Sequence, residues 1–349
     1  MVQPEIMPAT GMNLPPAGVS WRRKTVGLRF FIGGFGLFRA QWEGLSPNEH
    51  WTVLLNLTES LTIPELPREI DVVHIPMMPA PGPVPTLRFD RYIQYARLQY
   101  RHCFARLNGS FADYMAHFSA KSRSTLMRKV RKFKELAGGK IDWKVYCGKG
   151  AMPEFHRLAH TLSVQTYQEK LFNAGLSRYT VFEEQVRAAD DARGYILFHR
   201  GKPVSYLFCP VHDGILLYHT LGYDAAFRKW SPGTVLQFLA FESLFKEGCF
   251  TLFDFGPGEG QHKELFSTDS VFSVEMYYFK RTLHHYVTVL LHRGLVLGSC
   301  LVAKLLERLR VKHIVKRWIR GGSPPCSEDQ PGPVLTETAS TVGSLQFPA

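Results

Sequence analysis

Several features that would assign a function directly are missing from this sequence. The six cysteines lie far apart and include no CxxC pair, which argues against a local zinc site and favours a reducing compartment. No GxSxG, Walker A or dinucleotide-binding glycine motif occurs, so hydrolase, NTPase and Rossmann interpretations have no motif to support them. We therefore predict no metal. The first residues lack a charged segment followed by an apolar core, so we expect a cytoplasmic protein.

Acidic residues are also in short supply. The 349 residues include 42 Lys and Arg against 30 Asp and Glu, a formal net charge of +12. This excess favours acidic partners such as phosphates, nucleic acid or an anionic membrane face. The hydrophobic share of 45% and the charged share of 21% are those of a globular chain. The length predicts two domains.

The first concentration of positive charge, residues 119–139, predicts a helix. Ser119 or Ser122 can cap its start, and Gly138 with Gly139 can end it. One stripe is apolar, and the other faces carry Lys121, Arg123, Arg128, Lys129, Arg131, Lys132 and Lys134. A solvated helix face and a surface for a phosphate-rich ligand both fit this pattern.

A second basic segment covers residues 280–320. His292 and Arg293 interrupt its apolar run, leaving no clean stretch of about 20 residues to span a membrane. A helix packed on the protein is favoured, and contact of its basic end with anionic lipid is the alternative. Residues 321–349 are rich in Pro, Gly and Ser, which predicts a disordered tail.

Between the two basic segments the elements alternate in an orderly way. The sequence predicts a strand at 141–147, helices at 153–172 and 179–190, and three antiparallel strands that begin near 194, 204 and 215. The loop 225–236 then leads into a helix that is apolar almost all round and stops at Gly248, and strands follow at 250–255 and 271–280. In the N-terminal part, 51–57 and 71–77 resemble strands, and 89–107 resembles a helix running into a strand.

The loop AFRKWSPGTVLQ, residues 225–236, is a candidate pyrophosphate site. It opens a buried helix, and helix N-termini offer unpaired N–H groups and a partial positive charge. Gly233 keeps a side chain out of the way of a phosphate. Arg228 and Lys229 add cations, and Thr234 can donate one more hydrogen bond.

This loop and the order of the elements resemble those of the GNAT acyltransferases, whose phosphate loop has the form [Q/R]-x-x-G-x-[G/A]. Arg228, Ser231 and Gly233 fall on its marked positions, and Ser231 replaces the first glycine. Together with KSRSTLMRKVRK upstream, the segment FDFGPGEGQHKELFS (253–267) is similar to the CelD/BcsL-type (BioF2-like) branch, which is related to FemAB peptidyltransferases and associated with exopolysaccharide biosynthesis.

The resemblance implies a set of site residues. Asp254 and Glu259 are candidate bases, and His262 is a candidate acid because it stands where the branch usually has Tyr. A bound acyl-CoA would contact the loop residues, and a backbone N–H near His219 to Leu221 would polarise its carbonyl. The substrate-binding candidates are Lys263, Arg123 and Arg128. From the residues alone, Asp254 can equally serve only to bond turn amides.

The resemblance also implies an α/β (α+β) GNAT fold built as a FemAB-like tandem. The predicted parts are a flexible start (1–20), a degenerate GNAT-like half (21–118), an intact GNAT acetyltransferase domain (119–283), basic amphipathic helices (284–320) and the tail (321–349).

Three functions follow from these features. The first is an acetyl-CoA- or acyl-CoA-dependent N-acyltransferase with an amine acceptor, such as an amino sugar of exopolysaccharide or cell-envelope biosynthesis. The second is a FemAB-like transferase that takes its donor from aminoacyl-tRNA. The third is a non-catalytic module that binds an anionic membrane or a polysaccharide synthase through residues 280–320. The location expected with the third is the inner face of the membrane.

Overall fold

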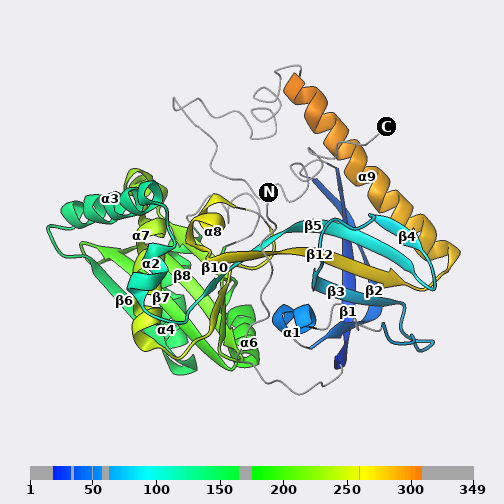
Figure 1. Cartoon of the computed structure of the whole chain (residues 1–349), viewed down its shortest axis with the longest axis horizontal. Coiled ribbons are helices and arrows are strands. Elements are labelled where there is room, and N and C mark those ends of the chain that lie inside the picture. The colour runs from blue at the N-terminus through cyan, green and yellow to red at the C-terminus, as the bar shows by residue number, and fades with distance from the viewer. Residues whose placement is uncertain are drawn as a thin grey trace. The chain divides into compact units, whose positions relative to one another are not determined.

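The computed structural model describes residues 19–32, 35–48, 50–56, 63–164, 175–258 and 260–308 (Figure 1). Within them the chain divides into two compact units. Residues 100–271 form the central unit, and residues 19–99 with 272–308 form the terminal unit. The divisions fall at 99/100 and 271/272, whereas the sequence predicted domain boundaries at 118/119 and 283/284. The predicted tail 321–349 lies outside the described residues.

The central unit is built on a mixed sheet. Its strands are β5 (Ile93–Arg106), β6 (Asp142–Cys147), β7 (Asp191–His199), β8 (Lys202–His212), β9 (Ile215–Leu217), β10 (Thr220–Tyr223) and β11 (Leu252–Asp254). The order is β5-β11-β9-β8-β7-β6, and β10 also pairs with β8. All neighbours are antiparallel except β9 and β11, which are parallel. The chain therefore crosses over between β9 and β11, and helix α7 lies in that connection.

Helices cover both faces of this sheet. The first face holds α2 (Phe111–Ala116), α3 (Ala120–Leu136), α7 (Pro232–Glu247) and α8 (Gln261–Phe266), and the second holds α4 (Met152–Ser163) and α6 (Tyr179–Ala188). Alternate residues of β7 show the division, because Tyr195 and Leu197 pack on the first face and Ile196 packs on the second. Figure 1 shows this layered arrangement.

Helix α7 is the apolar centre of the first face. Val235, Leu236, Ala240 and Phe241 are all fully buried, as expected for a helix without a polar stripe. Each buried side chain of this size contributes roughly 2 kcal/mol through removal from water. The helix ends at Gly248, whose φ of +65° places it in the left-handed region where glycine is favoured. The predicted helix and its stop are confirmed.

Most of the predicted elements of the central unit are present. Ser119 caps α3 by accepting the Ser122 N–H at 3.1 Å, and the predicted strands match β6, β7 and β8. Two predictions need correction. The third meander strand is broken into β9 and β10, and the glycine-rich segment after β11 contains the short helix α8, whose few residues gave no periodic signal.

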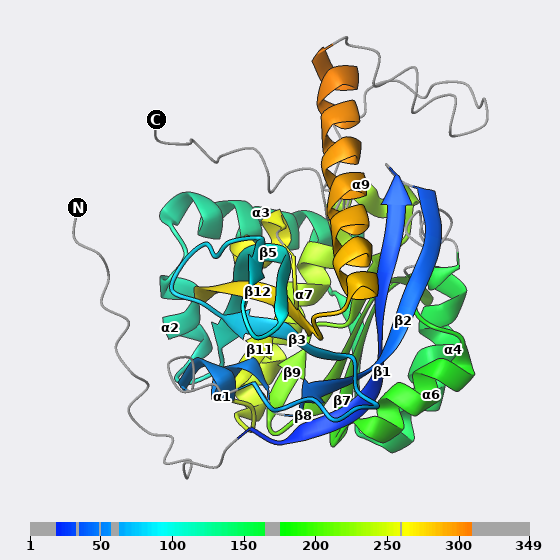
Figure 2. The same cartoon turned by 90° about the vertical axis from the view of Figure 1, so that its right-hand side faces the viewer.

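The strands of the terminal unit are ordered β1-β2-β3-β12-β5, and β4 lies beside β5. The elements not yet given are β1 (Trp21–Ile32), β2 (Phe35–Pro47), α1 (Trp51–Asn56), β3 (Val72–Pro79), β4 (Leu87–Phe89), β12 (Asp269–Phe279) and α9 (Leu283–Arg308). Figure 2 shows α9 running alongside the β1–β2 hairpin. That this unit is a degenerate GNAT-like half remains a prediction.

Two N-terminal predictions were wrong. Residues 51–57 contain a helix, α1, instead of a strand, and residues 93–106 form one long strand instead of a helix running into a strand. The long strand β5 crosses from the terminal into the central unit, so both of its faces are covered over much of its length. A strand that is buried on both sides loses the apolar–polar alternation that identifies strands in sequence.

Candidate active site

The break between β9 and β10 is a β-bulge. Leu216 lies opposite Val211 on β8, whereas Thr220 lies opposite Phe208, so β8 is one residue shorter over this interval. The His219 N–H also donates to the Phe208 carbonyl at 3.1 Å. His219 and Thr220 therefore share one partner residue, and such bulges bend a strand and redirect its side chains and amides.

The bulge directs one backbone N–H away from the ladder. The Asp224 N–H bonds to the Val204 carbonyl at 2.9 Å, and N–H groups alternate between the two edges of a strand. Leu221, three residues earlier, thus points its N–H away from β8. On that edge β11 ends at Asp254, and among the described residues β10 pairs only with β8. Of the two predicted carbonyl-polarising positions, the geometry suits Leu221, since the His219 N–H is already bonded.

Asp254, the last residue of β11, lies beside a buried histidine, a contact that the sequence did not suggest. Its Oδ1 atom lies 2.7 Å from His102 Nε2, and the two side chains are 1% and 0% exposed. The same oxygen accepts the Gly256 N–H at 2.6 Å. Asp254 thus holds the start of the glycine-rich turn and is shielded from solvent, so its predicted role as a base would have to act through a neighbouring group.

Lys263 secures the rest of this turn. Its Nζ atom donates to the carbonyls of Gly256, Pro257 and Gly258 at 3.2, 2.6 and 3.2 Å, which matches the three N–H donors of an ammonium group. The side chain is buried. This placement differs from the predicted substrate-binding role, because no donor is left for a substrate. Gly256 and Gly258 have φ values of +69° and +87°, which explains the glycines at both positions.

His262 lies on α8 beside Tyr218, the residue that precedes the bulge. Their ring centroids are 5.6 Å apart. Burial and, secondarily, the charge of Lys263 lower the pKa of His262 to about 4, so the ring is neutral at pH 7. Burial raises the pKa of Tyr218, which keeps its phenol protonated. The neutral ring offers one lone pair and one N–H, so His262 can accept a proton, and the protonated Tyr218 phenol beside it is a second candidate for the predicted acid role.

The predicted phosphate loop contains a short 3-10 helix, η2 (Ala225–Trp230), followed by α7. Ser231 joins them in the left-handed conformation at φ 53°, which places the first α-helical hydrogen bond between the Val235 N–H and the Ser231 carbonyl at 3.1 Å. The N–H groups of Gly233 and Thr234 come before that bond, and Pro232 has none. This is the anion-binding arrangement of a helix N-terminus that the sequence predicts.

Gly233 is buried against β10. A Cβ atom at this position would lie 2.8 Å from Leu221 Cδ2, a distance that real Cβ atoms avoid. A larger residue would therefore have to displace the Leu221 side chain, which belongs to the strand whose Leu221 N–H faces the open edge. Gly233 thus joins the start of α7 to the strand that carries the Leu221 N–H. The sequence suggested only that it leaves room for a phosphate.

The loop cations have different surroundings. Arg228 is exposed. Lys229 places its Nζ atom 4.1 Å from the centre of the Trp230 ring, and its carbonyl accepts a hydrogen bond from Lys132 of α3 at 3.2 Å. The basic helix and the loop are therefore neighbours.

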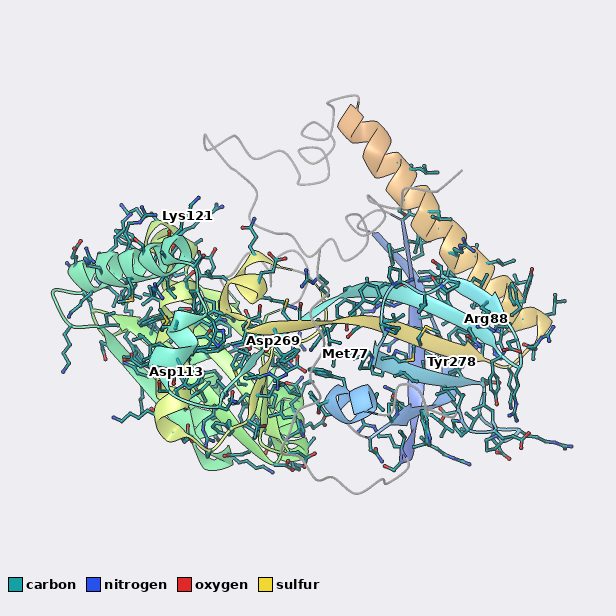
Figure 3. The ribbon with its side chains drawn as sticks, viewed as in Figure 1. Met77, Arg88, Asp113, Lys121, Asp269 and Tyr278 are labelled. Carbon is teal, nitrogen blue, oxygen red and sulfur yellow. The ribbon has the colours of Figure 1, made fainter. Side chains whose placement is uncertain are left out.

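The basic face of α3 borders a hollow of about 350 Å³. The lining residues are Lys121, Ser122, Thr125, Leu126 and Lys129 of α3 and Leu265 of α8. Figure 3 shows Lys121 on the outer side of α3. The predicted substrate residues Arg123 and Arg128 are also exposed, but neither lines this hollow. Arg123 instead donates to the Met115 carbonyl at 3.3 Å.

Three further observations bear on the predictions. Glu259, a predicted base, lies outside the described residues. Over the described ranges no group of three or more His, Cys, Asp or Glu side chains could hold a metal ion. Over the same ranges, every helix is too short or too polar to be a candidate for crossing a membrane.

Comparison with known families agrees with this geometry. Residues 120–264 match the family model described as acetyltransferase (GNAT) domain. This part of the chain is a GNAT acetyltransferase domain. The GNAT domain spans the bulge, the phosphate loop and the Asp254 turn, and it makes the protein an N-acyltransferase. The match covers less than half of the chain and leaves the finer branch within the family undetermined.

Solved structures show only distant likenesses. A C-terminal domain assigned to a lysylphosphatidylglycerol synthetase of Agrobacterium fabrum is 8% identical with a TM-score of 0.46, covering 79% of this chain and 88% of that one. FemX is 12% identical with a TM-score of 0.43, covering 77% and 90%. A GCN5-related N-acetyltransferase from Kribbella flavida is 10% identical with a TM-score of 0.33, covering 74% and 91%. These values are too low to indicate a shared activity. No curated protein matches.

Sequence reasoning missed His102 and Tyr218. His102 is 152 positions from its partner Asp254 and lies in a segment that was predicted to be helical, so the sequence held no signal for the pair. Tyr218 stands in the middle of a predicted strand. Its position before an unexpected bulge, and not its residue type, makes it a candidate.

Proposed function

We propose that this protein transfers an acyl group from acyl-CoA to an amine. One observation carries the proposal, namely that two features meet at Leu221. The bulge at His219 and Thr220 turns the Leu221 N–H away from β8, to the edge on which β11 ends at Asp254. Gly233 packs the start of α7 against the Leu221 side chain. A carbonyl-polarising donor and an anion-binding helix start are thus held together within the segment that matches the GNAT model.

The residues present fit a pyrophosphate. The Gly233 and Thr234 N–H groups point out of the first turn of α7, and Arg228 is exposed beside them. Two backbone donors at a helix start and a nearby guanidinium supply directed hydrogen bonds and positive charge to a phosphate. Acyl-CoA, when bound, supplies the activated thioester. The protein's task is then to orient that thioester and to manage the protons.

Transfer requires loss of one amine proton and protonation of the departing thiolate. We assign proton acceptance to the neutral His262 ring, and proton donation to Tyr218, whose phenol stays protonated. Asp254 and His102 act as positioning residues, because they hold the turn that carries α8 and with it His262. Glu259, which follows Gly258 in the sequence, remains a proposed base.

The acceptor proposed is an amino sugar or another small amine of exopolysaccharide or envelope biosynthesis. This finer statement rests on the resemblance of residues 119–281 to the CelD/BcsL-type branch. The exposed cations of α3 support an acceptor that carries phosphate, as nucleotide-activated sugars do.

Calorimetric titration with acetyl-CoA and with free CoA tests the proposal. We expect micromolar binding of both ligands, lost in Gly233→Glu, whose carboxylate would displace Leu221, and weakened about tenfold in Arg228→Ala because one charge-assisted contact is removed. Arg187→Ala, which removes an exposed arginine of α6, is the matched control and should bind normally. Absence of binding to the wild type would reject acyl-CoA as donor.

An aminoacyl-tRNA donor is the second candidate, favoured by the contact between the basic helix and the loop, Lys132 Nζ to the Lys229 carbonyl. A surface of this charge would bind RNA with strong salt dependence. Ribonuclease treatment separates the candidates. It would abolish transfer from aminoacyl-tRNA and leave transfer from acyl-CoA unchanged.

A further inference from the structure

Helix α9 of the terminal unit has two apolar faces. The inner face packs on the sheet through His285, Val289 and His292, which are 3%, 1% and 1% exposed. His292 is fixed there by Tyr95, whose hydroxyl lies 2.7 Å from Nδ1, and by the Arg29 carbonyl, 3.0 Å from Nε2. These contacts determine which side of the helix faces outward.

The outward side is unusually apolar. Its exposed large side chains are Leu283, Tyr286, Val287, Leu290, Leu291, Leu297, Leu301 and Val302. Most are spaced by three or four residues, so they form one stripe on the helix. From Leu283 to Val302 the stripe is roughly 30 Å long at 1.5 Å per residue. Scattered exposed leucines need no explanation, but a continuous stripe of this length indicates a binding surface.

A second element extends the stripe. The β1–β2 hairpin ends in Ile32, Leu37 and Phe38, which are 48%, 50% and 54% exposed. Phe38 stacks on Phe30 at 4.3 Å, and Phe30 meets the His292 ring edge-on at 5.1 Å. The apolar hairpin end is thus joined to α9 within one unit (Figure 2).

In the sequence, the segments that form this surface carry charge of one sign. No Asp or Glu occurs in residues 19–42 or in residues 276–306. Residues 304–320 carry seven cations, Lys304, Arg308, Arg310, Lys312, Lys316, Arg317 and Arg320, against the single acid Glu307. Clusters of cations next to an apolar stripe are complementary to anionic lipid, which offers both negative headgroups and hydrocarbon.

We infer that α9 and the β1–β2 hairpin end form a surface that docks on an anionic lipid bilayer. The helix lies in the plane of the interface, with its outward stripe immersed and the hairpin end inserted beside it. This inference does not depend on the proposed acyltransfer, because none of its residues belongs to the candidate active site.

Vesicle co-sedimentation of the full chain tests the inference. We expect binding to vesicles of equal parts phosphatidylglycerol and phosphatidylcholine that is at least about tenfold stronger than binding to phosphatidylcholine alone, and that weakens as salt rises. The double variant Val287→Glu, Leu291→Glu places two charges on the stripe and should lose at least about tenfold in binding. Phe38→Ser should lose less.

The control places the same charges elsewhere. Val164→Glu combined with Val181→Glu changes two valines of the central unit that are 44% and 47% exposed, and it should bind vesicles like the wild type. Circular dichroism shows whether each variant is folded.

Absence of wild-type binding to both vesicle types would overturn the inference, and so would equal losses of binding in the two double variants. If light scattering shows a dimer that only the α9 variant disrupts, and vesicles are not bound, a second copy is the partner instead of lipid. CoA titration of the α9 variant keeps a failure here separate from a failure of the acyltransferase proposal.

Discussion

Each unit of the molecule places a histidine beside a carboxylate, and these two pairs differ in what surrounds them. In the terminal unit His74 Nε2 lies 3.0 Å from Glu275 Oε1, and Glu275 also binds Arg97 and the Tyr277 hydroxyl. In the central unit His102 lies 2.7 Å from Asp254, which otherwise accepts the amide of a glycine turn. One pair joins a network of side chains, and the other holds backbone.

The two carboxylates, Glu275 and Asp254, differ in what they can do. Burial alone would raise the pKa of Glu275, but the hydrogen bond from His74 and the charge of Arg97 outweigh it and lower the pKa to about 2. Such a network of side chains engages the carboxylate fully and stabilises the sheet. Asp254 instead ends a strand next to the bulge, where a small shift would move His262. We therefore place the chemistry in the central unit.

The largest effect on activity is expected for Asp254→Asn. The change keeps the shape but weakens the side-chain oxygen that accepts the Gly256 N–H and lies beside His102, so the turn should be held less firmly. We expect kcat to fall by about 100-fold, with CoA affinity and fold retained, measured by steady-state kinetics beside calorimetry. Full activity in this variant would remove Asp254 from the proposed machinery.

The matching change in the terminal unit, Glu275→Gln, should act on stability instead. It removes the negative charge beside Arg97, and we expect a loss of about 3 kcal/mol in unfolding free energy, measured with urea. The contribution of Glu275 also has a pH signature. Because its folded pKa is depressed, the stabilisation is present above about pH 4.5 and is lost as pH falls towards about 2. The Gln variant should lack that loss. A variant that is inactive but fully stable would contradict the division of roles.

Two histidines, one in each unit, have pKa values that are lowered to the same extent. Burial first, then nearby positive charge, lowers the pKa of His262 to about 4, and burial likewise lowers that of His292 to about 4. Unfolded histidine binds protons from about pH 6.5 downward, so both make the fold less stable between pH 6.5 and 4. His262→Phe and His292→Phe should each make that decline less steep, but only His262→Phe should lower kcat, by about tenfold or more. Equal activity of the two variants would reject His262 as the base.

The smallest effects should come from a pair of glycines. Gly233→Ala forces a methyl group against Leu221, at 2.8 Å, and should cost about 1 kcal/mol and weaken CoA binding. Gly298→Ala, within α9, meets nothing within 4 Å and should stabilise the protein by about 0.5–1 kcal/mol, because alanine favours a helix. Thermal unfolding measures both. A neutral Gly233→Ala would mean that the Leu221 side chain yields to the added methyl group.

The sequence predicted the elements whose signals are local. Helix α3 has a serine cap, an apolar stripe and terminal glycines, and α7 has its Pro-Gly start and its Gly248 stop, so both were found from residues alone. The helix start after residues 225–231 was predicted for the same reason, and its role as a phosphate loop stays a prediction. The family resemblance supplied the rest of the GNAT order.

The features that the sequence could not predict depend on contacts between residues that lie far apart in the chain. The bulge depends on the register between β8 and β10, which no residue type announces. The His102–Asp254 pair requires β5 to be a strand. Because β5 is buried on both faces, its sequence lacks the alternation that would have identified a strand. Lys263 shows a third limit, because its charge suggested a ligand while its surroundings are three carbonyls of its own turn.

The central unit is inserted into the terminal unit, since the chain enters it along β5 and leaves it along β12. These two strands are neighbours in the sheet, so the entry and exit points are adjacent. In evolutionary terms, an acyltransferase module of this kind can be gained, lost or exchanged as a single cassette without changing the host's termini. The same adjacency means that the host, closed by a short linker from Gln99 to Phe272, could survive as a separate folded protein.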